Sequence, residues 1–378
     1  MSTFDSRRPR VLVIENSLDF TGGLNSILRS CCLLNDQFEF HFILPSKSKS
    51  SIFVKQKGFV VYEWPMKEIR KDVVSILTYL PFLFYNAFKL YRKVKKLNVS
   101  LIVSNDLYNL MPPVYRLMGG KIQYVCYVRF FPSKFPSYVR YIWSWLHNRY
   151  ARFIIAVSHV VKNEFPYAEN VVVIGNEMPD KNVDLSFSTA QVILYPANFI
   201  EGKGHRCALC CFAEVSRNYP HWKLRFIGSD MGLKKNKEYQ KRLIKEAGSL
   251  GLTNSVEWSG FSHDMEKEYL NAGIVLNFSE SESFSLTCLE AMFYGRPVIA
   301  TKSGGPQEII WSGIDGILVN VNDVSAMSKA LGDLIGNSDK RWKIAQNAYE
   351  SVRKNFNLDK IKRQIGAVYI EALVSTVK

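Results

Sequence analysis

The chain has 378 residues, more than a single hydrophobic core usually supports, so its length predicts two domains. Hydrophobic residues make up 47% of the chain and aromatic residues 13%, a composition that excludes an intrinsically disordered protein and favours a well-buried globular enzyme. The formal net charge of +15 favours an anionic partner over a cationic one.

The positive charge is concentrated in the N-terminal half. Residues 1–190 contain 25 Lys and Arg against 14 Asp and Glu, a net charge of +11, whereas residues 191–378 contain 24 against 20, a net charge of +4. Such a basic half is expected to face a membrane surface, a lipid-linked phosphate or a nucleic acid. We expect no nucleic-acid partner, because the sequence contains no recognised nucleic-acid-binding motif.

The chain contains seven cysteines, an odd number, behind a polar N-terminus whose first apolar run is only Val11 to Ile14. No secretory signal is expected there, and reduced thiols in the cytoplasm fit best. Cys207 and Cys210 form a C-x-x-C pair, which in some proteins binds a metal or performs redox chemistry. Neither a second such pair nor a closely spaced His pair accompanies it, so we favour packing inside a helix.

Short apolar runs alternate with helical segments along the first half, the pattern of a doubly wound parallel sheet. Strands are expected at 11–15, 39–44, 60–62, 101–104, 122–127, 153–157 and 171–174. The first strand leads into Gly22-Gly23 and then into a helix from about Leu24 to Leu33. A glycine pair at this place is either a turn that a ligand approaches closely or a plain strand-to-helix turn.

Residues 73–88 form an uncharged run that contains Pro81 and is followed by the basic residues Lys89, Arg92, Lys93, Lys95 and Lys96. A transmembrane helix needs about 20 apolar residues, so we expect no membrane span here. The segment is either a crossover helix pair with a solvated basic end or an interfacial patch that holds the protein on an anionic membrane. The first interpretation is favoured.

The segment from Phe130 to Leu146 is dense in aromatic residues and also carries the cations Lys134 and Arg140. Aromatic faces with a few cations suit sugar stacking or lipid contact. They suit a simple packed helix equally well, so both interpretations stay open.

A polar connector at 180–189 leads to a second series of strands, expected at 192–196, 224–227, 256–258, 274–278 and 298–300. The first of these strands enters a loop that contains Asn198, Lys203 and Gly204, and a helix follows. Gly228 ends the next strand in a turn suited to close approach by a ligand, and Phe261 follows the strand at 256–258. The last helix is expected over 358–374.

The most informative segment runs from Glu282 to Glu308, where Glu282 and Glu290 flank the pattern of a helix. Ser283 is expected to cap this helix, and Gly295 is expected to end it. From residue 284 to residue 290 the helix rises about 9 Å at roughly 1.5 Å per residue, comparable to the reach from a diphosphate to its ribose. A diphosphate bound by the free amides of residues 284–286 would place the ribose near Glu290 and a transferable sugar near Glu282.

This segment resembles the GT-B glycosyltransferases of the large retaining group called family 4. The match consists of the two acids at the E-x7-E spacing, then Phe284-Ser285-Leu286, Leu289-Glu290-Ala291-Met292 and the sequence GRPVIA at 295–300. A lone pair of acids at this spacing would more often be a solvent-facing pair in an ordinary βαβ unit, but the assembled block favours the transferase. The resemblance covers nearly the whole chain, strongly at 191–310 and loosely at 1–180.

The resemblance implies the GT-B fold, two doubly wound Rossmann-like domains facing across a cleft. It implies an acceptor-side domain at 1–185 and a nucleotide-sugar donor domain at 190–356, with the C-terminal helix at 357–378 packing back on the first domain. In the family, a glycine pair in the place of Gly22 and Gly23 faces the cleft, and the backbone around the position of Phe261 borders the nucleobase.

The resemblance also implies roles for charged residues. Glu290 is expected to bind the ribose, Glu282 a hydroxyl of the donor sugar, and Lys203 the donor phosphates together with the backbone of residues 284–286. Asn198 stands where the family has an Arg, which removes one cation from the phosphate clamp. Arg206 is a candidate replacement.

The catalytic residue of the first domain is the least certain part of this assignment. Many relatives have a His after the strand that corresponds to residues 122–127, where this chain offers Arg129. Asp19 and Asp106 are further candidates, although each is more often a turn or cap residue.

The function that the resemblance implies is transfer of a hexose from a nucleotide diphosphate sugar to a hydroxyl of a sugar or lipid-linked acceptor, with retention. It fits cell-surface polysaccharide or glycolipid synthesis in the cytoplasm or on the inner face of a membrane. We expect no metal or other cofactor, since amides and Lys203 stabilise the departing diphosphate and no D-x-D pair follows a plausible strand. The alternatives are a GT-B sugar-nucleotide epimerase and a non-catalytic nucleotide-sugar-binding protein; a phosphorylase of related architecture would have a far longer chain.

Overall fold

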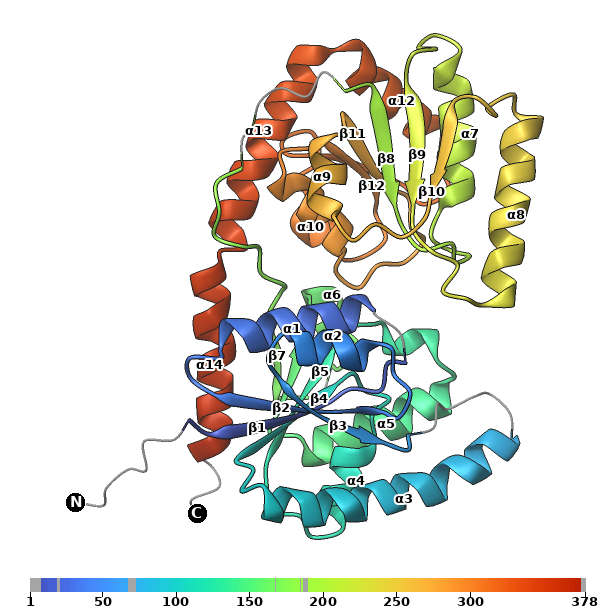
Figure 1. The fold of residues 1–378 in the computed structure, drawn as a ribbon. Helices are drawn as coiled ribbons and strands as arrows, with labels where there is room; N and C mark the ends of the chain where they lie inside the picture. The colour runs from blue at the N-terminus through green and yellow to red at the C-terminus, as the bar shows by residue number, and fades with distance from the viewer. Residues whose placement is uncertain are drawn as a thin grey trace. The chain divides into compact units, whose positions relative to one another are not determined.

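The structure is a computed structural model that describes residues 8–18, 21–66, 73–166, 168–183, 185 and 190–374, with the backbone alone at 73–78. The chain divides into two compact units, residues 1–176 with 359–378 and residues 177–358. Each unit is built on its own parallel sheet with helices packed on it (Figure 1). The predicted fold class, α/β with two doubly wound units, is confirmed.

Seven parallel strands form the sheet of the N-terminal unit, in the order β3-β2-β1-β4-β5-β6-β7. They are β1 (Arg10–Ile14), β2 (Glu39–Pro45), β3 (Val60–Trp64), β4 (Leu101–Asn105), β5 (Tyr124–Val128), β6 (Phe153–Ala156) and β7 (Val171–Val173). Each overlaps one of the predicted apolar runs. The chain moves outward from β1 to β3 and then returns to β4 on the other side of β1, so the strand order reverses between β1 and β4. Ligands of such sheets bind at the carboxyl ends of the strands at this switch point.

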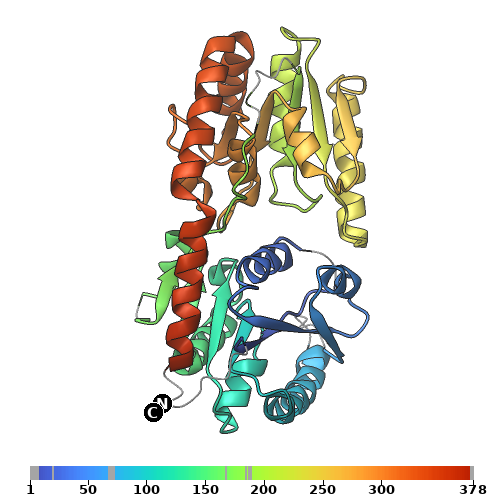
Figure 2. The same ribbon diagram turned by 60° about the vertical axis from the view of Figure 1, so that its left-hand side comes forward.

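The helices of this unit are α1 (Gly22–Leu33), α2 (Ser50–Gln56), α3 (Val73–Lys96), α4 (Met111–Leu117), α5 (Ser137–Tyr150), α6 (His159–Lys162) and α14 (Leu358–Val374), with a 3-10 turn at Pro132–Lys134. Figure 1 shows α1 and α2 on one face of the sheet and α3, α4 and α5 on the other. Right-handed crossovers in the two directions from β1 require this arrangement. Helix α14 packs on this unit (Figure 2). There the Tyr369 ring lies 5.6 Å from that of Phe38.

Two helices of this unit differ from the prediction. Helix α1 begins at Gly22, because Thr21 caps it by accepting a hydrogen bond from the N–H of Leu24 at 3.1 Å. The glycine pair is therefore the first turn of the helix and not a turn before it. Helix α3 is one continuous helix of 24 residues with Pro81 inside it, where a helix pair was expected. Packing of its inner face outweighs the hydrogen bond lost at the proline; that face is formed by Leu83, Ala87, Leu90 and Val94.

Among the residues that the structure describes, none of the helices is both long enough and apolar enough to cross a membrane.

Six parallel strands form the sheet of the C-terminal unit, in the order β10-β9-β8-β11-β12-β13. They are β8 (Val192–Pro196), β9 (Lys223–Ile227), β10 (Val256–Ser259), β11 (Ile274–Asn277), β12 (Val298–Thr301) and β13 (Ile317–Val319). The prediction missed β13, whose three-residue run gives little periodic signal. The strand order reverses between β8 and β11, so this unit has its own switch point.

The helices of the C-terminal unit are α7 (His205–Ser216), α8 (Lys234–Ser249), α9 (Met265–Leu270), α10 (Leu286–Phe293), α11 (Pro306–Ile309), α12 (Val324–Gly336) and α13 (Ser338–Asn355). A core of large side chains that includes Phe199, Phe212, Phe226 and Leu331 joins the sheet to these helices. Burial on both faces holds the strands rigidly, so the loops at their carboxyl ends start from fixed positions.

Candidate active site

Charged side chains meet at the switch point of the C-terminal unit. The loop after β8 carries Lys203 and the loop after β11 carries Glu282, and Lys203 Nζ lies 2.6 Å from Glu282 Oε1. The two side chains are 33% and 16% exposed, so the ion pair is partly shielded but can be reached from solvent. The structure therefore brings together two residues that the sequence analysis assigned to the site separately.

Buried hydrogen bonds fix the backbone on both sides of this ion pair. The Tyr195 hydroxyl donates to the carbonyl oxygen of Lys203 at 2.5 Å and accepts from the N–H of Phe278 at 3.0 Å. The N–H of Glu280 donates to the carbonyl oxygen of Gly202 at 2.8 Å, which joins the two loops directly. Burial raises the pKa of the Tyr195 phenol well above its usual value, so the hydroxyl keeps its proton. Tyr195 was not among the predicted residues, because a tyrosine in a buried strand usually indicates packing alone.

Two glycines of these loops are required by close backbone contacts. Gly204 has a φ of 75°, and a Cβ there would lie 2.0 Å from the carbonyl oxygen of Phe278. A Cβ at Gly228 would lie 2.0 Å from the carbonyl oxygen of Ala197. The protein's own backbone therefore requires a glycine at position 228, and the approach of a ligand to this turn stays a prediction.

Helix α10 begins at Leu286 with Ser285 as its N-cap, so the prediction of Ser283 as the cap is wrong. The Ser285 Oγ accepts hydrogen bonds from the N–H of Cys288 at 3.3 Å and from Nδ2 of Asn277 at 2.8 Å. These two bonds hold Ser285 at a φ of 83°, a left-handed conformation uncommon outside glycine. Helix geometry leaves the first amides of α10 without partners inside the helix, which suits them to bind an anion.

The segment before α10 is pinned to the loop after β12. The N–H of Glu282 donates to the carbonyl oxygen of Ser303 at 2.9 Å, and the N–H of Gly305 donates to the carbonyl oxygen of Glu282 at 2.7 Å. The Phe284 ring is buried, 6.0 Å from that of Phe356. These tertiary contacts keep residues 282–284 out of the helix, and they leave Phe284 only its backbone to offer a ligand.

Glu290 lies on α10, where its Oε2 accepts a hydrogen bond from the Tyr269 hydroxyl at 3.2 Å. Burial raises the pKa of the Tyr269 phenol well above its usual value, so the phenol is a donor at every physiological pH. A ligand was the predicted polar partner of Glu290, and Tyr269, which lies on a different helix, was not predicted. A carboxylate offers about four lone-pair sites, so the bond from Tyr269 leaves Glu290 able to accept from a ribose hydroxyl.

The remaining predicted donor residues have varied surroundings. Asn198 Oδ1 accepts from the N–H and the hydroxyl of Ser229, at 3.0 and 3.2 Å, and so ties the loop after β8 to the loop after β9. Arg206 is bonded to Glu246 on α8 at 2.8 Å and is 73% exposed. The structure does not bring Arg206 to Lys203, so Arg206 does not replace the missing cation. The Phe261 side chain is half exposed, as a residue that covers a nucleobase would be.

The cysteine pair lies on α7, where Cys207 packs against the core of the C-terminal unit. Burial raises the pKa of both thiols. Within the described ranges, no group of three His, Cys, Asp or Glu side chains is arranged to hold a metal ion. The packing interpretation agrees with these surroundings, and metal independence of the reaction stays a prediction.

A second polar cluster lies at the carboxyl ends of β1, β4 and β5 in the N-terminal unit. Arg129 donates from Nε to Asn105 Oδ1 at 2.9 Å and from Nη1 to Ser26 Oγ at 2.5 Å. Its guanidinium lies over the ring of Tyr127, with the Cζ atom 4.5 Å from the centroid. Asn105 in turn donates to the buried carboxylate of Glu15. The predicted catalytic arginine is therefore held by several groups of its own unit.

Asp106 belongs to the same cluster and accepts a hydrogen bond from the N–H of Arg129 at 2.7 Å. Burial raises the pKa of Asp106 to about 7, although Arg129 opposes this shift. A Cβ at Gly23 would lie 3.6 Å from side-chain atoms of Arg129, Asn105 and Asp106, so the first turn of α1, Gly22 and Gly23, lies directly against the cluster. Asp19, the other candidate, lies outside the described residues.

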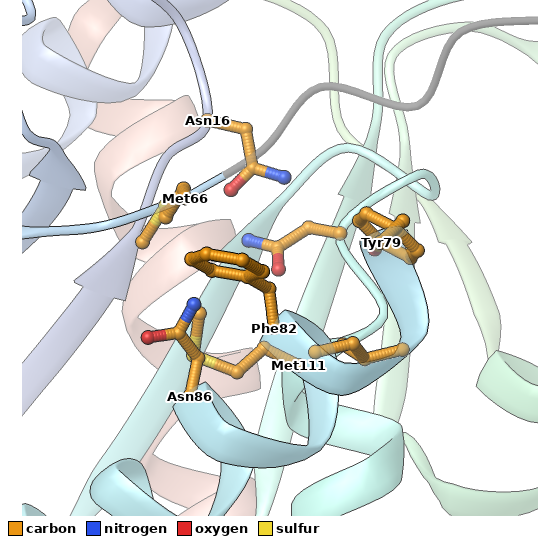
Figure 3. Close-up of a pocket in the computed structure, with 8 residues that line it drawn as sticks. Asn16, Met66, Tyr79, Phe82, Asn86 and Met111 are labelled. Atoms are coloured by element: carbon orange, nitrogen blue, oxygen red, sulfur yellow. The ribbon is translucent and has the colours of Figure 1, made fainter. Parts of the chain in front are cut away.

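A small cavity of about 20 Å³ opens at the same switch point (Figure 3), with room for about one water molecule. It is lined by Asn16, Met66, Tyr79, Phe82, Leu83, Asn86, Asn109 and Met111. Asn86 Nδ2 donates to the carbonyl oxygen of Pro65 at 2.9 Å, which fixes the orientation of the amide. The Oδ1 atoms of Asn86 and Asn16 are buried and accept no hydrogen bond from the described part of the chain. A single water molecule, which can donate to such oxygens, suits this cavity.

The sequence matches the family described as glycosyl transferases group 1 over residues 176–351. An exopolysaccharide phosphotransferase of Streptomyces coelicolor is 31% identical over 206 residues, 54% of this chain but only 21% of that protein's length. A lipopolysaccharide 1,2-N-acetylglucosaminetransferase of Salmonella typhimurium is 25% identical over 349 residues, 88% of this chain and 83% of that protein. The crystal structure of Anabaena HepE in complex with UDP-glucose has a TM-score of 0.81 at 20% identity, covering 96% of this chain and 99% of HepE. At this identity the likeness to HepE shows the fold alone.

Proposed function

Because residues 176–351 match the glycosyl transferases group 1 family and the chain has the GT-B fold, we propose that it transfers a hexose from a nucleotide diphosphate sugar to an acceptor hydroxyl. The observation that carries this proposal is the Lys203–Glu282 ion pair beside the first amides of α10. A cation and free amides at one switch point form a site for a diphosphate, and an adjoining carboxylate can accept from a sugar hydroxyl.

Lys203 and the amides of α10 act on the leaving group. Negative charge grows on the departing diphosphate during transfer, and donors already in place stabilise that charge without reorganisation. Lys203 Nζ has three protons to donate and gives one of them to Glu282. A donor phosphate therefore shares the ammonium group with Glu282, and the carboxylate keeps further acceptor sites for a hydroxyl of the transferred sugar.

Glu290 is the proposed ribose ligand, because its carboxylate lies on the same helix whose first amides bind the diphosphate. Asn198 is neutral and is occupied by Ser229, so this chain has one cation where the family pattern has two. The amides of α10 then carry a larger share of the charge stabilisation than they would beside an arginine. We propose that the transfer reaction needs no metal ion.

The acceptor is a glycan or a lipid-linked sugar, and the N-terminal unit supplies the features that support this part. Its net charge of +11 over residues 1–190 suits a lipid-linked phosphate. We place the reaction at the cytoplasmic face of an anionic membrane, in polysaccharide or glycolipid synthesis. Retention of the anomeric configuration is part of the proposal.

A thermal-shift screen against UDP, GDP, ADP, CMP and dTDP tests the donor site. UDP is the first choice, since the structurally similar HepE binds UDP-glucose. A ligand at about 100 times its dissociation constant stabilises the folded protein by about 2.7 kcal/mol, a readily measured shift. The positive nucleotide is then tested as its sugar diphosphate, with and without acceptor, and the product anomer is determined by NMR.

The same assay separates the alternatives. Acceptor-dependent release of nucleotide supports the transferase, and a retained anomer supports the retaining reaction. Conversion of the donor sugar without acceptor would indicate an epimerase. Binding of nucleotide with no turnover across glycan and lipid-linked acceptors would indicate a nucleotide-sugar-binding protein.

A further inference from the structure

Helix α5 carries an apolar stripe on its outer face. Tyr138, Tyr141, Ile142 and Trp145 recur at the spacing of one helix face and are between 49% and 71% exposed. The opposite face is anchored by Trp143 and His147, which are buried. A helix on the surface of a globular protein normally turns such a stripe inward, toward the core. Here the stripe faces out.

Helix α3 carries a second apolar stripe that ends in cations. Leu80, Phe84, Phe88 and Tyr91 are between 44% and 52% exposed on the outer face of this helix. Arg92, Lys95 and Lys96 follow in its last turns and are exposed as well. Lys89 and Lys93 behave differently, because their ammonium groups lie 4.6 Å from the Trp64 ring and 3.5 Å from the Tyr62 ring. These two lysines pack on β3, so the exposed cations of α3 are the other three.

The two stripes lie on the same face of one sheet. Figure 1 shows α3, α4 and α5 together on the face of the N-terminal sheet opposite to α1 and α2, and α4 packs against both of its neighbours. Leu117 and Met118, at the end of α4, are exposed too. Exposed apolar side chains in such number on one face indicate an interaction surface.

The charged residues of the segment that contains α3, α4 and α5 are almost all basic. Residues 73–150 contain 11 Lys and Arg and a single acidic residue, Asp106, which is buried at the switch point. The outer surface of α3, α4 and α5 therefore combines aromatic and aliphatic side chains with cations that no acidic side chain of the same segment offsets. An anionic bilayer is complementary to both properties, since Trp and Tyr favour the headgroup region and Lys and Arg are drawn to anionic lipids.

We propose that the outer faces of α3 and α5 form a docking platform for an anionic membrane surface. The side chains of the two apolar stripes enter the headgroup region, and Arg92, Lys95 and Lys96 contact the anionic headgroups. The bilayer is favoured over a nucleic acid because Leu80 and Ile142 have no π-face for a base to stack on, whereas they insert readily among acyl chains. The platform rests on the membrane location included in the proposed function and names the surface responsible for it, but it does not depend on the transferase reaction itself.

Co-sedimentation of the full chain with vesicles tests the platform. We expect binding to vesicles of phosphatidylglycerol and phosphatidylcholine in equal parts, weak binding to phosphatidylcholine alone, and loss of binding as the salt concentration rises. The variant Arg92→Glu/Lys95→Glu/Lys96→Glu should bind the anionic vesicles on the order of a hundredfold more weakly. Tyr141→Ser/Trp145→Ser should bind at least about tenfold more weakly.

Matched controls come from the C-terminal unit. Lys235→Glu/Lys237→Glu/Lys241→Glu makes the same change of charge on exposed positions of α8, and Trp311→Ser removes an exposed tryptophan elsewhere. Both controls should bind vesicles like the wild type. Circular dichroism melts of all variants exclude unfolding as the cause of lost binding, and the nucleotide thermal-shift assay reports on the donor site separately.

Three outcomes would overturn the platform. Wild-type binding that is indifferent to phosphatidylglycerol would remove the electrostatic part of the argument. An α8 control that loses as much binding as the α3 variant would show that overall charge acts rather than this face. A wild-type dimer in solution that the Tyr141→Ser/Trp145→Ser variant dissociates, with vesicle binding unchanged, would show that the stripe is a subunit interface.

Discussion

The two units place charged residues at the same point of the same kind of sheet, yet they use them differently. In the N-terminal unit, the carboxylates of Glu15 and Asp106 are both buried. Asp106 accepts a hydrogen bond from the N–H of Arg129, and Asn105 links the Arg129 side chain to Glu15. In the C-terminal unit, the Lys203–Glu282 pair is partly exposed, and buried groups such as Tyr195 hold only its backbone. The switch point itself therefore does not decide whether charges are structural or available to a ligand.

What decides it is how many protein groups each charge contacts. Removing one charged group from a buried, hydrogen-bonded cluster leaves its buried partners without a hydrogen-bond partner and lowers the free energy of unfolding. Removing a partly exposed charged group leaves its partner solvated by water, so the change affects ligand binding and turnover more than stability. The contrast predicts that substitutions in the N-terminal cluster change stability, whereas substitutions at the C-terminal switch point change turnover and donor affinity.

Arg129→Ala is expected to give the largest effect, a loss of about 3–5 kcal/mol in the free energy of unfolding. Its guanidinium bonds to Asn105 and Ser26 would be lost within a buried cluster. Chemical denaturation measures this loss. Arg140→Ala, at an exposed position of α5, is the control and should stay within about 0.5 kcal/mol of the wild type. Unchanged stability of Arg129→Ala together with lost turnover would instead make Arg129 a catalytic group and break the comparison.

Asp106→Asn should change how stability depends on pH. The Asp106 pKa rises from 3.8 to about 7 on folding, so its contribution to stability is complete below pH 3.8 and is lost as the pH rises through 7. The two values differ by the equivalent of about 4 kcal/mol. The Asn variant keeps an oxygen for the N–H of Arg129 and tolerates the positive φ of 75°. Its free energy of unfolding should therefore increase relative to that of the wild type between pH 5 and about pH 8. Urea denaturation at a series of pH values measures the gain, and a difference that does not vary with pH would contradict the assignment.

Lys203→Ala should reduce turnover by about 10²–10³-fold, the usual cost of removing one preorganised donor from a developing negative charge. Because the pair is partly exposed, the free energy of unfolding should change little. Lys203→Arg should recover little activity, since a planar fork does not replace a point charge. Arg206→Ala, in the first turn of α7, is the matched control and should retain activity. Full activity of Lys203→Ala would remove Lys203 from the phosphate site.

Glu290→Ala should weaken donor binding by roughly 10- to 150-fold, the worth of a hydrogen bond to a charged group. It should also cost some stability, because the buried Tyr269 hydroxyl loses its acceptor. Glu290→Gln separates the two effects, since its amide oxygen still accepts from Tyr269. We expect Glu290→Gln to keep the melting temperature while donor binding, measured by calorimetry, still falls. Normal donor binding by both variants would contradict the ribose role.

The strands and the switch points could be predicted from the sequence because each strand is a short apolar run of its own. Candidate residues for the C-terminal site could be proposed because they lie close to one another along the chain, from Glu282 to Glu290, or on a loop whose Lys and Gly form a recognisable pair. Helix boundaries were less predictable. Ser283 matched the pattern of an N-cap, but hydrogen bonds between Glu282 and residues 303–305 hold the segment out of the helix.

The sequence by itself determined the α/β class, the course of most strands and the candidate residues Lys203, Glu282 and Glu290, since local periodicity and short-range motifs carry that information. Only the tertiary structure decided the partners. Tyr195 supports Lys203, Tyr269 supports Glu290, and Arg129 is bound within a cluster drawn from four separate segments. These contacts join residues far apart in the chain, and a tyrosine that will pack and one that will also donate a hydrogen bond look the same until the fold brings its partner near.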